Sequence, residues 1–211
     1  VYADTALPVE FVGHPFLAPD YAAPVRYDPA GPVLLLPGSR VGPVKRIFPV
    51  LLAGFQEFGE REAVVLYPSE AIHDVLRAAN PPANVRLART GEPVAAAAVL
   101  TSSGTMSMHC ALAGIPGAVT YRTDPVTYLL GRLLVKVEYL GIANLLLGEA
   151  MYPEYIQGAA TPAALAAELR ACVHDPARRA RTATEAAGLR ALLSVPANGT
   201  AADWLARQLA G

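Results

Sequence analysis

Two short loops carry the residue types that bind phosphate. One is Leu36-Pro37-Gly38-Ser39-Arg40 and the other is Ser102-Ser103-Gly104-Thr105, and each closes an apolar run of strand length. Each loop leads into a segment of helical period, so backbone N–H groups and the helix dipole favour an anion there. A pyrophosphate requires backbone donors, a hydroxyl and a cation. The two loops supply all three, from Gly38, Ser39, Arg40, Ser103, Gly104 and Thr105.

Each loop also has a purely structural interpretation. Small glycine and serine turns end many strands of α/β proteins for steric reasons alone. Arg40 equally fits a surface arginine that pairs with a nearby carboxylate. The prediction of a phosphate site therefore depends on whether the two loops meet in space.

The elements that must position these loops follow from the hydrophobic pattern. Apolar runs alternate with segments of helical period, which is typical of βαβ units, and right-handed crossovers then place helices on both faces of the sheet. Strands are expected near 33–36, 62–67, 84–88, 97–102 and 116–121. Helices are expected near 44–58, 69–79, 104–114, 125–134, 161–174, 177–193 and 200–210. The predicted fold class is α/β, a Rossmann-like parallel sheet with helices on both faces.

Three stretches of the chain differ in character. Residues 1–30 combine an apolar segment with spaced prolines, which predicts a leading strand and a linker. Residues 31–160 form the expected α/β domain, and the alanine-rich residues 161–211 form helices that pack on or beyond it. Ligands of open parallel sheets bind beyond the carboxyl ends of the strands, where the strand order reverses. Both glycine loops and Arg122, which follows the fifth strand, are expected at that edge.

Composition limits the class of protein. Hydrophobic residues make up 53% of the 211 residues and charged residues 17%, which excludes a disordered tail. The formal net charge of −1 gives no basic field, so no nucleic-acid partner is expected. Neither cysteine has a metal-ligand spacing, and no metal or cofactor is expected. No signal peptide or membrane-spanning run is visible, which predicts a cytoplasmic protein. The chain begins at Val1, which suggests part of a longer protein.

Several polar residues stand in apolar surroundings. Asn144, Glu154 and Gln157 are candidates for ligand contact, because buried amides and carboxylates need partners. The alternative role is to satisfy backbone groups of nearby loops. His14, in a Gly-His-Pro turn, is a further candidate for the cleft. The segment 128–136 is apolar and basic, so it is either a core helix or a contact with acyl chains or an anionic membrane surface.

Four stretches resemble the lipid-A-disaccharide synthase family. They are residues 9–15, 34–40 and 103–105, and above all residues 133–157, which read LLVKVEYLGIANLLLGEAMYPEYIQ. The last stretch is similar to the family's segment nearly throughout, and Thr161-Pro162 follows it. The resemblance covers essentially the whole chain but only the carboxyl-terminal half of the family's sequence.

The resemblance implies one half of a GT-B glycosyltransferase, the UDP-sugar-binding half. The family transfers diacylglucosamine from UDP to a diacylglucosamine 1-phosphate, with inversion, in lipid A biosynthesis. That scheme requires no metal. The partners implied are a UDP-sugar, a lipid acceptor and a peripheral contact with the cytoplasmic face of the inner membrane. The catalytic base and the acceptor contacts are expected in the family's amino-terminal half, so this chain alone is expected to be inactive.

Three positions depart from the family's pattern. His109 replaces a glutamate suited to the ribose hydroxyls, and a neutral imidazole accepts one hydrogen bond where a carboxylate accepts several. Pro43 replaces a second glutamate, and Ala143 replaces a proline. These departures keep two alternatives open: a different GT-B or epimerase-type enzyme acting on a UDP-sugar, and an inactive binding module that retains the fold.

Overall fold

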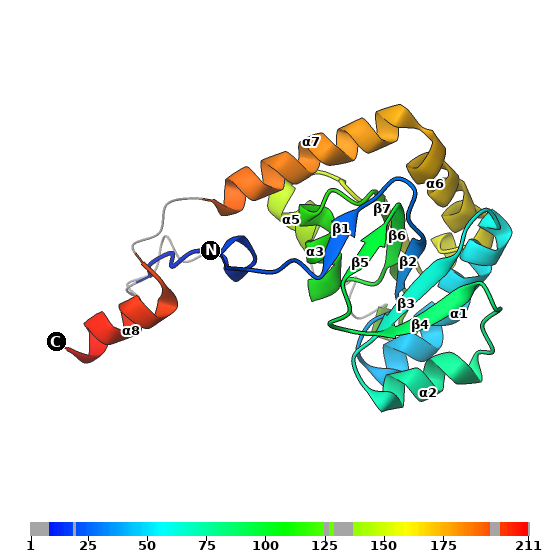
Figure 1. Cartoon of the computed structure of the whole chain (residues 1–211), viewed down its shortest axis with the longest axis horizontal. Coiled ribbons are helices and arrows are strands. Elements are labelled where there is room, and N and C mark those ends of the chain that lie inside the picture. Colours follow the sequence, from blue (N-terminus) through cyan, green and yellow to red (C-terminus); the bar gives the residue numbers. More distant parts are fainter. Residues whose placement is uncertain (1–8, 19, 125–126, 129–136, 195–198, 211) are drawn as a thin grey trace.

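A parallel sheet organises the molecule (Figure 1). The computed structural model of the chain describes residues 9–18, 20–124, 127–128, 137–194 and 199–210. All pairings in the six-stranded sheet are parallel. The strands lie in the order β4 (Val85–Arg89), β3 (Ala63–Tyr67), β2 (Val33–Leu36), β6 (Ala98–Thr101), β7 (Gly117–Tyr121) and β8 (Glu154–Ile156). This order is that of the Rossmann fold, with the reversal between β2 and β6.

A second, smaller sheet lies beside the first. It pairs β1 (Val25–Tyr27) with β5 (Val94–Ala96), again in parallel. The Arg61 guanidinium, just before β3, donates to the carbonyls of Pro29 and Gly31 at 2.8 Å each. The chain that precedes β2 is therefore tied to the domain by backbone pairing and by one arginine.

The central strands are buried on both faces, because helices cover both sides of the sheet. Helices α1 (Val41–Phe58), α2 (Glu70–Ala78) and α6 (Pro162–His174) share one hydrophobic cluster with Val33 and Leu35 of β2. Helices α3 (Thr105–Leu112), α5 (Ile142–Leu147) and α7 (Pro176–Leu193) share the other cluster with Leu34 and Leu36. Side chains that alternate along one strand thus enter different cores, which explains the uninterrupted apolar run.

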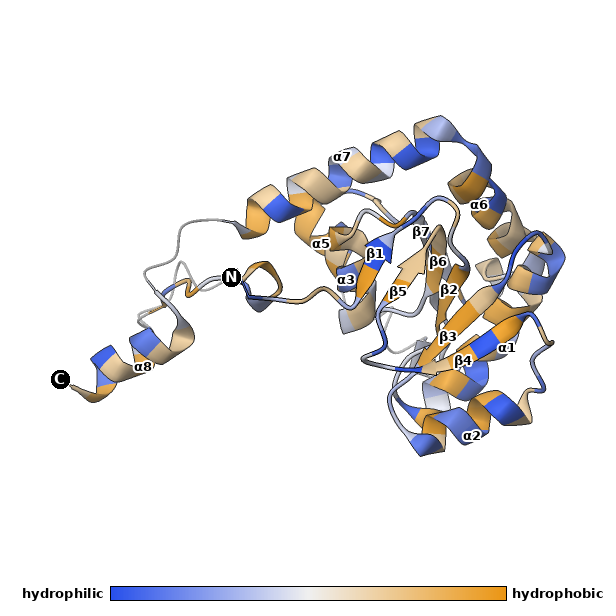
Figure 2. Cartoon of the chain, viewed as in Figure 1, coloured by the Kyte–Doolittle hydropathy of each residue, from blue (hydrophilic) through white to orange (hydrophobic). Residues whose placement is uncertain are grey.

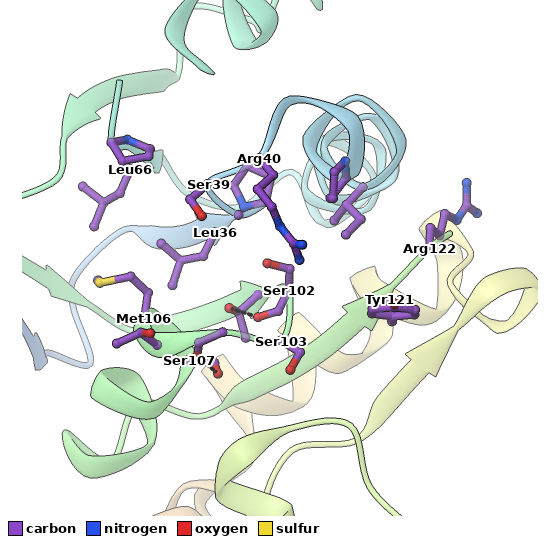
Figure 3. A pocket seen from close by; sticks show the side chains of 18 of the residues that line it. Leu36, Ser39, Arg40, Leu66, Ser102, Ser103, Met106, Ser107, Tyr121 and Arg122 are labelled. Atoms are coloured by element: carbon purple, nitrogen blue, oxygen red, sulfur yellow. Dashed lines mark hydrogen bonds between the residues drawn. The ribbon is translucent and has the colours of Figure 1, made fainter. Parts of the chain in front are cut away.

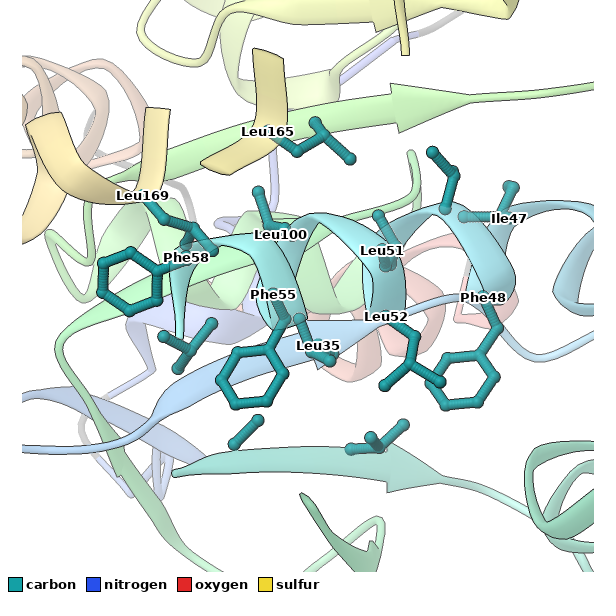
Figure 4. Packing of buried hydrophobic residues seen from close by; sticks show 14 of the residues in the cluster. Leu35, Ile47, Phe48, Leu51, Leu52, Phe55, Phe58, Leu100, Leu165 and Leu169 are labelled. Carbon is teal, nitrogen blue, oxygen red and sulfur yellow. The ribbon is translucent and has the colours of Figure 1, made fainter. Parts of the chain in front are cut away.

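The first cluster is dominated by α1, whose apolar residues point towards β2, β6 and α6 (Figure 4). Phe48, Leu51 and Phe55 are at most 1% exposed. Burial of each such side chain stabilises the fold by about 1.5–3 kcal/mol. Gly54 permits the close approach of α1 and α6, because a Cβ atom there would lie 2.6 Å from the Cβ of Leu165. The packing on this face holds the amino terminus of α1 at the sheet edge.

The predicted fold class is confirmed, and the five predicted strands and most predicted helices agree with the structure within a few residues. Helix α1 begins at Val41 rather than near 44, since Pro43 is tolerated in a first turn where its missing N–H is not needed. The helix predicted over 125–134 lies almost entirely outside the described residues.

The sequence did not indicate β1, β5, β8 or α5. Each is three to six residues long, too short for a periodic pattern to identify. The leading strand and turn, which the apolar segment 9–15 was expected to form, are not found there: the described residues 9–14 contain no strand, and a short 3-10 helix, η1 (Pro15–Leu17), follows them.

Helix α8 (Ala201–Leu209) lies away from the sheet, near the amino-terminal segment (Figure 1). Arg207 pairs with Glu10 of that segment at 2.9 Å. No residue of α8 is buried, although Leu205 and Leu209 give it an apolar side (Figure 2). Among the C-terminal helices, α6 and α7 therefore pack on the α/β domain, whereas α8 extends beyond it.

Candidate anion-binding site

A cavity of about 440 Å³ opens at the carboxyl ends of β2, β3, β6 and β7, where the strand order reverses (Figure 3). Both glycine loops line it, which is where open parallel sheets bind their ligands. The polar lining residues come mainly from the loops after β2, β6 and β7, from the end of β7 and from the first two turns of α1 and α3. They include Ser39, Arg40, Arg46, Ser102, Ser103, Thr105, Ser107, Tyr121, Arg122 and Thr123.

The first loop requires glycine at position 38. Gly38 has φ of +114°, which other residues rarely adopt, and a Cβ atom would lie 3.2 Å from Oγ of Ser102. The backbone N–H of Ser102 donates to the carbonyl of Leu36 at 2.8 Å, so the two loops lie in contact. Arg40 is the N-cap residue of α1, and its side chain makes no capping hydrogen bond.

The second loop ends at Gly104, the N-cap residue of α3. No side chain caps this helix either, and the space where a Cβ of Gly104 would lie is open. The backbone N–H and the hydroxyl of Ser107 both donate to the carbonyl of Gly104, at 3.1 and 2.6 Å. The N–H groups of Thr105 and Met106 therefore remain available in the first turn, as anion binding requires.

The charge of the lining is positive. Arg40, Arg46 and Arg122 line the cavity, and no aspartate or glutamate is among its lining residues. Arg40 and Arg46 are exposed, and within the described part of the chain neither forms an ion pair. The alternative was that Arg40 pairs with a carboxylate, and among the described residues Arg40 has no such partner. Guanidinium groups, hydroxyls and free helix N–H groups together suit a di-anion such as a pyrophosphate.

Sequence reasoning missed Arg46. It lies in α1, three residues after Pro43, and both residues line the cavity. Residues three apart share a face of a helix, so this spacing was a readable signal. In the sequence alone, Lys45 and Arg46 look like ordinary solvent-facing charges.

Arg122 is among the lining residues, but its guanidinium is anchored in the protein and points away from Arg40 and Ser102 (Figure 3). Its Nη2 donates to the carbonyl of Ala160 at 2.6 Å. Gln157 forms two hydrogen bonds to the backbone of the next residue, Thr123: its Oε1 accepts from the N–H at 3.0 Å and its Nε2 donates to the carbonyl at 3.1 Å. Gln157 does not line the cavity; it holds the loop that carries Arg122.

Asn144 and Glu154 also lie outside the cavity lining. Asn144 is fully buried and bonds to both backbone groups of Tyr152, at 2.9 and 2.7 Å. The Glu154 carboxylate accepts from the N–H groups of Leu140 and Gly141 and from Nδ2 of Asn144. Of the two roles considered from sequence, these contacts are those of residues that satisfy loop backbone groups.

His109 lies one turn beyond the cavity-lining start of α3 but is not among the lining residues. The hydroxyl of Tyr21 hydrogen bonds to its Nδ1 at 2.7 Å, and the Phe16 ring centroid lies 4.0 Å from that of the imidazole. Burial and the neighbouring His14 lower the pKa of His109. His14 likewise lies in this aromatic cluster and not in the cavity lining. The structure therefore places His109 against the amino-terminal segment, of which His14 is a part.

Solved structures share this architecture. The spinosyn rhamnosyltransferase SpnG is 18% identical, with a TM-score of 0.55, over 90% of this chain and 50% of that chain. The calicheamicin glycosyltransferase CalG4 is 16% identical, with a TM-score of 0.53, over 78% of this chain and 39% of that chain. The fold and the position of the cavity thus define the class: one Rossmann-like half of a GT-B glycosyltransferase fold.

Sequence comparison identifies the family within that class. The model of the lipid-A-disaccharide synthetase family matches residues 1–192, and the chain belongs to that family. The lipid-A-disaccharide synthase of Syntrophus aciditrophicus is 36% identical over 93% of this chain and 56% of its own length. That of Nitrosococcus oceani is 31% identical over 100% of this chain and 59% of its own. The resemblance seen in the sequence is confirmed, and the chain spans little more than half of these relatives.

The apolar and basic segment 128–136 lies, apart from Tyr128, outside the described residues, so neither of its two interpretations is examined by the structure. Among the residues that the structure does describe, no helix has both the length and the apolar character needed to cross a membrane.

Proposed function

We propose that this chain is the donor-binding half of a lipid-A-disaccharide synthase and that its cavity holds the pyrophosphate of UDP-diacylglucosamine. The observation that carries the proposal is the lining of the cavity at the β2–β6 reversal. Three arginines, no carboxylate and two helix amino termini without side-chain caps converge there. Family membership supports the uridine nucleotide and the sugar.

Within this proposal each loop has a distinct task. The N–H groups of Thr105 and Met106 at the start of α3 bind phosphate oxygens, assisted by the hydroxyl of Ser39. Arg40 and Arg46 supply the charge, since guanidinium bonds to phosphate are stronger than neutral ones. Positive groups that lie where charge develops on the departing diphosphate would stabilise the transition state.

The proposed reaction joins C1 of the donor sugar to the 6-hydroxyl of a diacylglucosamine 1-phosphate acceptor. The C1–O bond to UDP breaks, UDP leaves with the bonding electrons, and the hydroxyl proton passes to a base. We place that base and the acceptor contacts in the part of the relatives that this chain does not cover. Positioning of two substrates across a cleft supplies much of the rate, so the chain alone is expected to bind nucleotide without transferring sugar. A peripheral membrane contact for the lipid substrates belongs to the same proposal.

Isothermal titration of UDP into the 211-residue chain tests the donor site. We expect binding that weakens as salt rises, since screening reduces charge-assisted contacts, and that is at least about tenfold tighter than for uridine, which lacks the pyrophosphate. Equal affinity for UDP and uridine would show that the cavity does not bind the phosphates. No binding at millimolar UDP would refute the donor site in this chain.

A binding module without transferase activity is the second candidate. The observation that favours it is the position of His109, which Tyr21 and Phe16 hold outside the cavity lining. A protein spanning the length of the relatives, given UDP-diacylglucosamine and the lipid acceptor, separates the two candidates. Formation of disaccharide and UDP supports the synthase, whereas UDP binding without product supports the binding module.

A further inference from the structure

We infer that Glu154 is a positioning residue of the proposed donor site and that it acts through the Leu140–Gly141 peptide group on the hydroxyl of Ser103. The inference rests on the proposed function for its ligand. The geometry that carries it lies within the protein and is open to a separate test.

The Glu154 carboxylate collects its donors from one short segment. The N–H of Leu140 donates to Oε2 at 2.9 Å and the N–H of Gly141 donates to Oε1 at 2.9 Å. Nδ2 of Asn144 donates to the same Oε1 at 2.9 Å. No arginine, lysine or histidine pairs with Glu154 within the described ranges. The negative charge of Glu154 is thus balanced by oriented N–H groups, which fixes the segment in one arrangement.

Asn144 completes this arrangement and leaves none of its amide groups for a ligand. Its Oδ1 accepts from the N–H of Tyr152, while Nδ2 donates to the carbonyl of Tyr152 and to Glu154. Asn144 lies in α5, and Tyr152 precedes β8. One buried amide therefore joins the helix after the Leu140–Gly141 segment to the strand that carries Glu154.

The connection to the cavity passes through a single peptide group. The carbonyl of Leu140 and the N–H of Gly141 belong to the same planar unit, whose two ends point in opposite directions. The N–H end donates to Glu154, and the carbonyl end accepts from Oγ of Ser103 at 2.7 Å. A carboxylate on the N–H end polarises the peptide group and strengthens its carbonyl as an acceptor. Ser103 lines the cavity and directly precedes Gly104, where α3 begins.

Gly141 shows how closely this contact is built. A Cβ atom at Gly141 would lie 3.2 Å from Oε1 of Glu154 and 3.3 Å from Cγ2 of Val119. The absence of a side chain lets the carboxylate reach the N–H. By this route the orientation of Glu154 determines where the hydroxyl of Ser103 lies relative to the free N–H groups of α3.

Hydrogen exchange on the unliganded chain tests the connection without any nucleotide. In Glu154→Gln an amide NH2 group replaces an acceptor oxygen, so we expect amide exchange within residues 103–107 to rise roughly five- to tenfold, above all at Ser107, whose N–H donates to the carbonyl of Gly104. Ser103→Ala should raise it similarly, and the double variant should equal Ser103→Ala alone. Asp175→Asn, the matched change at a carboxylate that accepts a backbone N–H far along the chain, should leave exchange at residues 103–107 unchanged.

Two results of the exchange experiment would overturn the inference. One is that Glu154→Gln raises the exchange rate at residues 138–141 but leaves the rate at residues 103–107 unchanged. The other is faster exchange throughout β8 and α5, which is the signature of general loosening. If Glu154→Gln unfolds, Glu154→Asp takes its place; its shorter side chain keeps the charge but loses reach, and the same non-additivity with Ser103→Ala is expected.

UDP titration gives the functional arm. Glu154→Gln and Ser103→Ala should each weaken UDP binding roughly five- to tenfold, and the double variant no further. An undiminished effect of Glu154→Gln in the Ser103→Ala background would show that Glu154 acts by another route and would refute the inference. If the unmodified chain does not bind UDP, the proposed function fails, while the exchange experiment still decides whether Glu154 positions Ser103.

Discussion

The helix amino termini at the cavity and those in the C-terminal part of the chain are built differently. The N-cap residues of α1 and α3 are Arg40 and Gly104, and neither caps its helix with a side chain. Helices α6 and α7 each follow a capping residue and begin with proline, in the pairs Thr161-Pro162 and Asp175-Pro176. Helix α8 has a full capping box between Thr200 and Asp203. In each of the three C-terminal helices a side chain thus accepts from one N–H of the first turn, whereas in the two cavity helices none does.

The difference concerns the balance between helix stability and ligand binding at the start of a helix. A cap contributes about 1 kcal/mol to stability, because the first N–H groups of a helix otherwise lack partners. At the cavity those groups are the ones that an anion would bind, and a cap would occupy them. Helices α2 and α5 also lack a side-chain cap, and their N-cap residues Ser69 and Gly141 do not line the cavity. What distinguishes α1 and α3 is that their uncapped amino termini border one cavity that is also lined by arginines.

Adding a charged cap at the cavity should produce the largest effect. In Gly104→Asp the carboxylate would cap α3 in space that is now open. Two like charges about 4 Å apart repel by about 4 kcal/mol at an effective dielectric constant of 20, so we expect UDP affinity to fall more than a hundredfold. Stability should rise by a few tenths of a kcal/mol. Calorimetry and thermal unfolding measure both. Gly104→Asn is the uncharged control, and UDP binding by Gly104→Asp at the original affinity would contradict the site.

Removal of a cavity cation should have the next largest effect. Arg40→Ala should weaken UDP binding by about 1.5–3 kcal/mol through loss of a charge-assisted bond. Because Arg40 is exposed and has no ion-pair partner among the described residues, the free energy of unfolding should change by less than about 0.5 kcal/mol. Calorimetry and chemical denaturation measure the two effects. Arg26→Ala, at an exposed arginine of β1, is the control. If Arg40→Ala and Arg26→Ala weaken UDP binding equally, the effect comes from the overall charge of the protein and not from a binding site.

Removal of a cap from the other region should reverse the pattern. Asp175 Oδ1 accepts from the N–H of Ala177 at 2.8 Å at the start of α7. Asp175→Ala should therefore lower the free energy of unfolding by about 1 kcal/mol and leave UDP affinity unchanged. Asp175→Asn keeps an acceptor oxygen, so its free energy of unfolding should be close to that of the original protein. Urea denaturation gives the stabilities, and a change in UDP affinity in Asp175→Ala would break the separation between the two regions.

The smallest effect concerns pH. Burial and His14 lower the pKa of His109 below its ordinary value of 6.5. The unfolded chain therefore binds a proton at a pH where the folded chain does not, so stability is full above pH 6.5 and declines as pH falls towards the lowered pKa. His109→Gln should flatten this decline, because the glutamine side chain does not titrate. Urea denaturation at a series of pH values measures it, and an unchanged slope in His109→Gln would exclude His109 as the cause.

The parts of the fold that were predictable are those whose pattern is local. Strands β2 and β6 can be predicted from their apolar runs, and the turns that end them from their glycines. The reason is that strand burial and turn geometry depend on adjacent residues. The Arg40 and Gly104 loops are therefore found from sequence together with their place at one sheet edge. Arg46 was within reach of the same reasoning, through its spacing from Pro43.

Other site features depend on residues that are distant in the chain. The partner of His109 is Tyr21, 88 positions away, and the partner of Ser103 is Leu140, 37 positions away. The sequence shows three polar residues in an apolar stretch, Asn144, Glu154 and Gln157. Their spacing does not tell whether they bind a ligand or the backbone of a loop, because it is the same in both cases. The choice between those roles is made by which backbone groups surround them.

By itself, the sequence determined the Rossmann-like sheet, the family and the two glycine loops, because periodicity and turn chemistry act over a few neighbouring residues. Only the tertiary structure decided that three arginines and two uncapped helices share one cavity, and that His109, Asn144, Glu154 and Gln157 do not line it. The physical reason is that hydrogen bonds and burial satisfy a side chain through whatever lies next to it in space, and no local pattern records that neighbour.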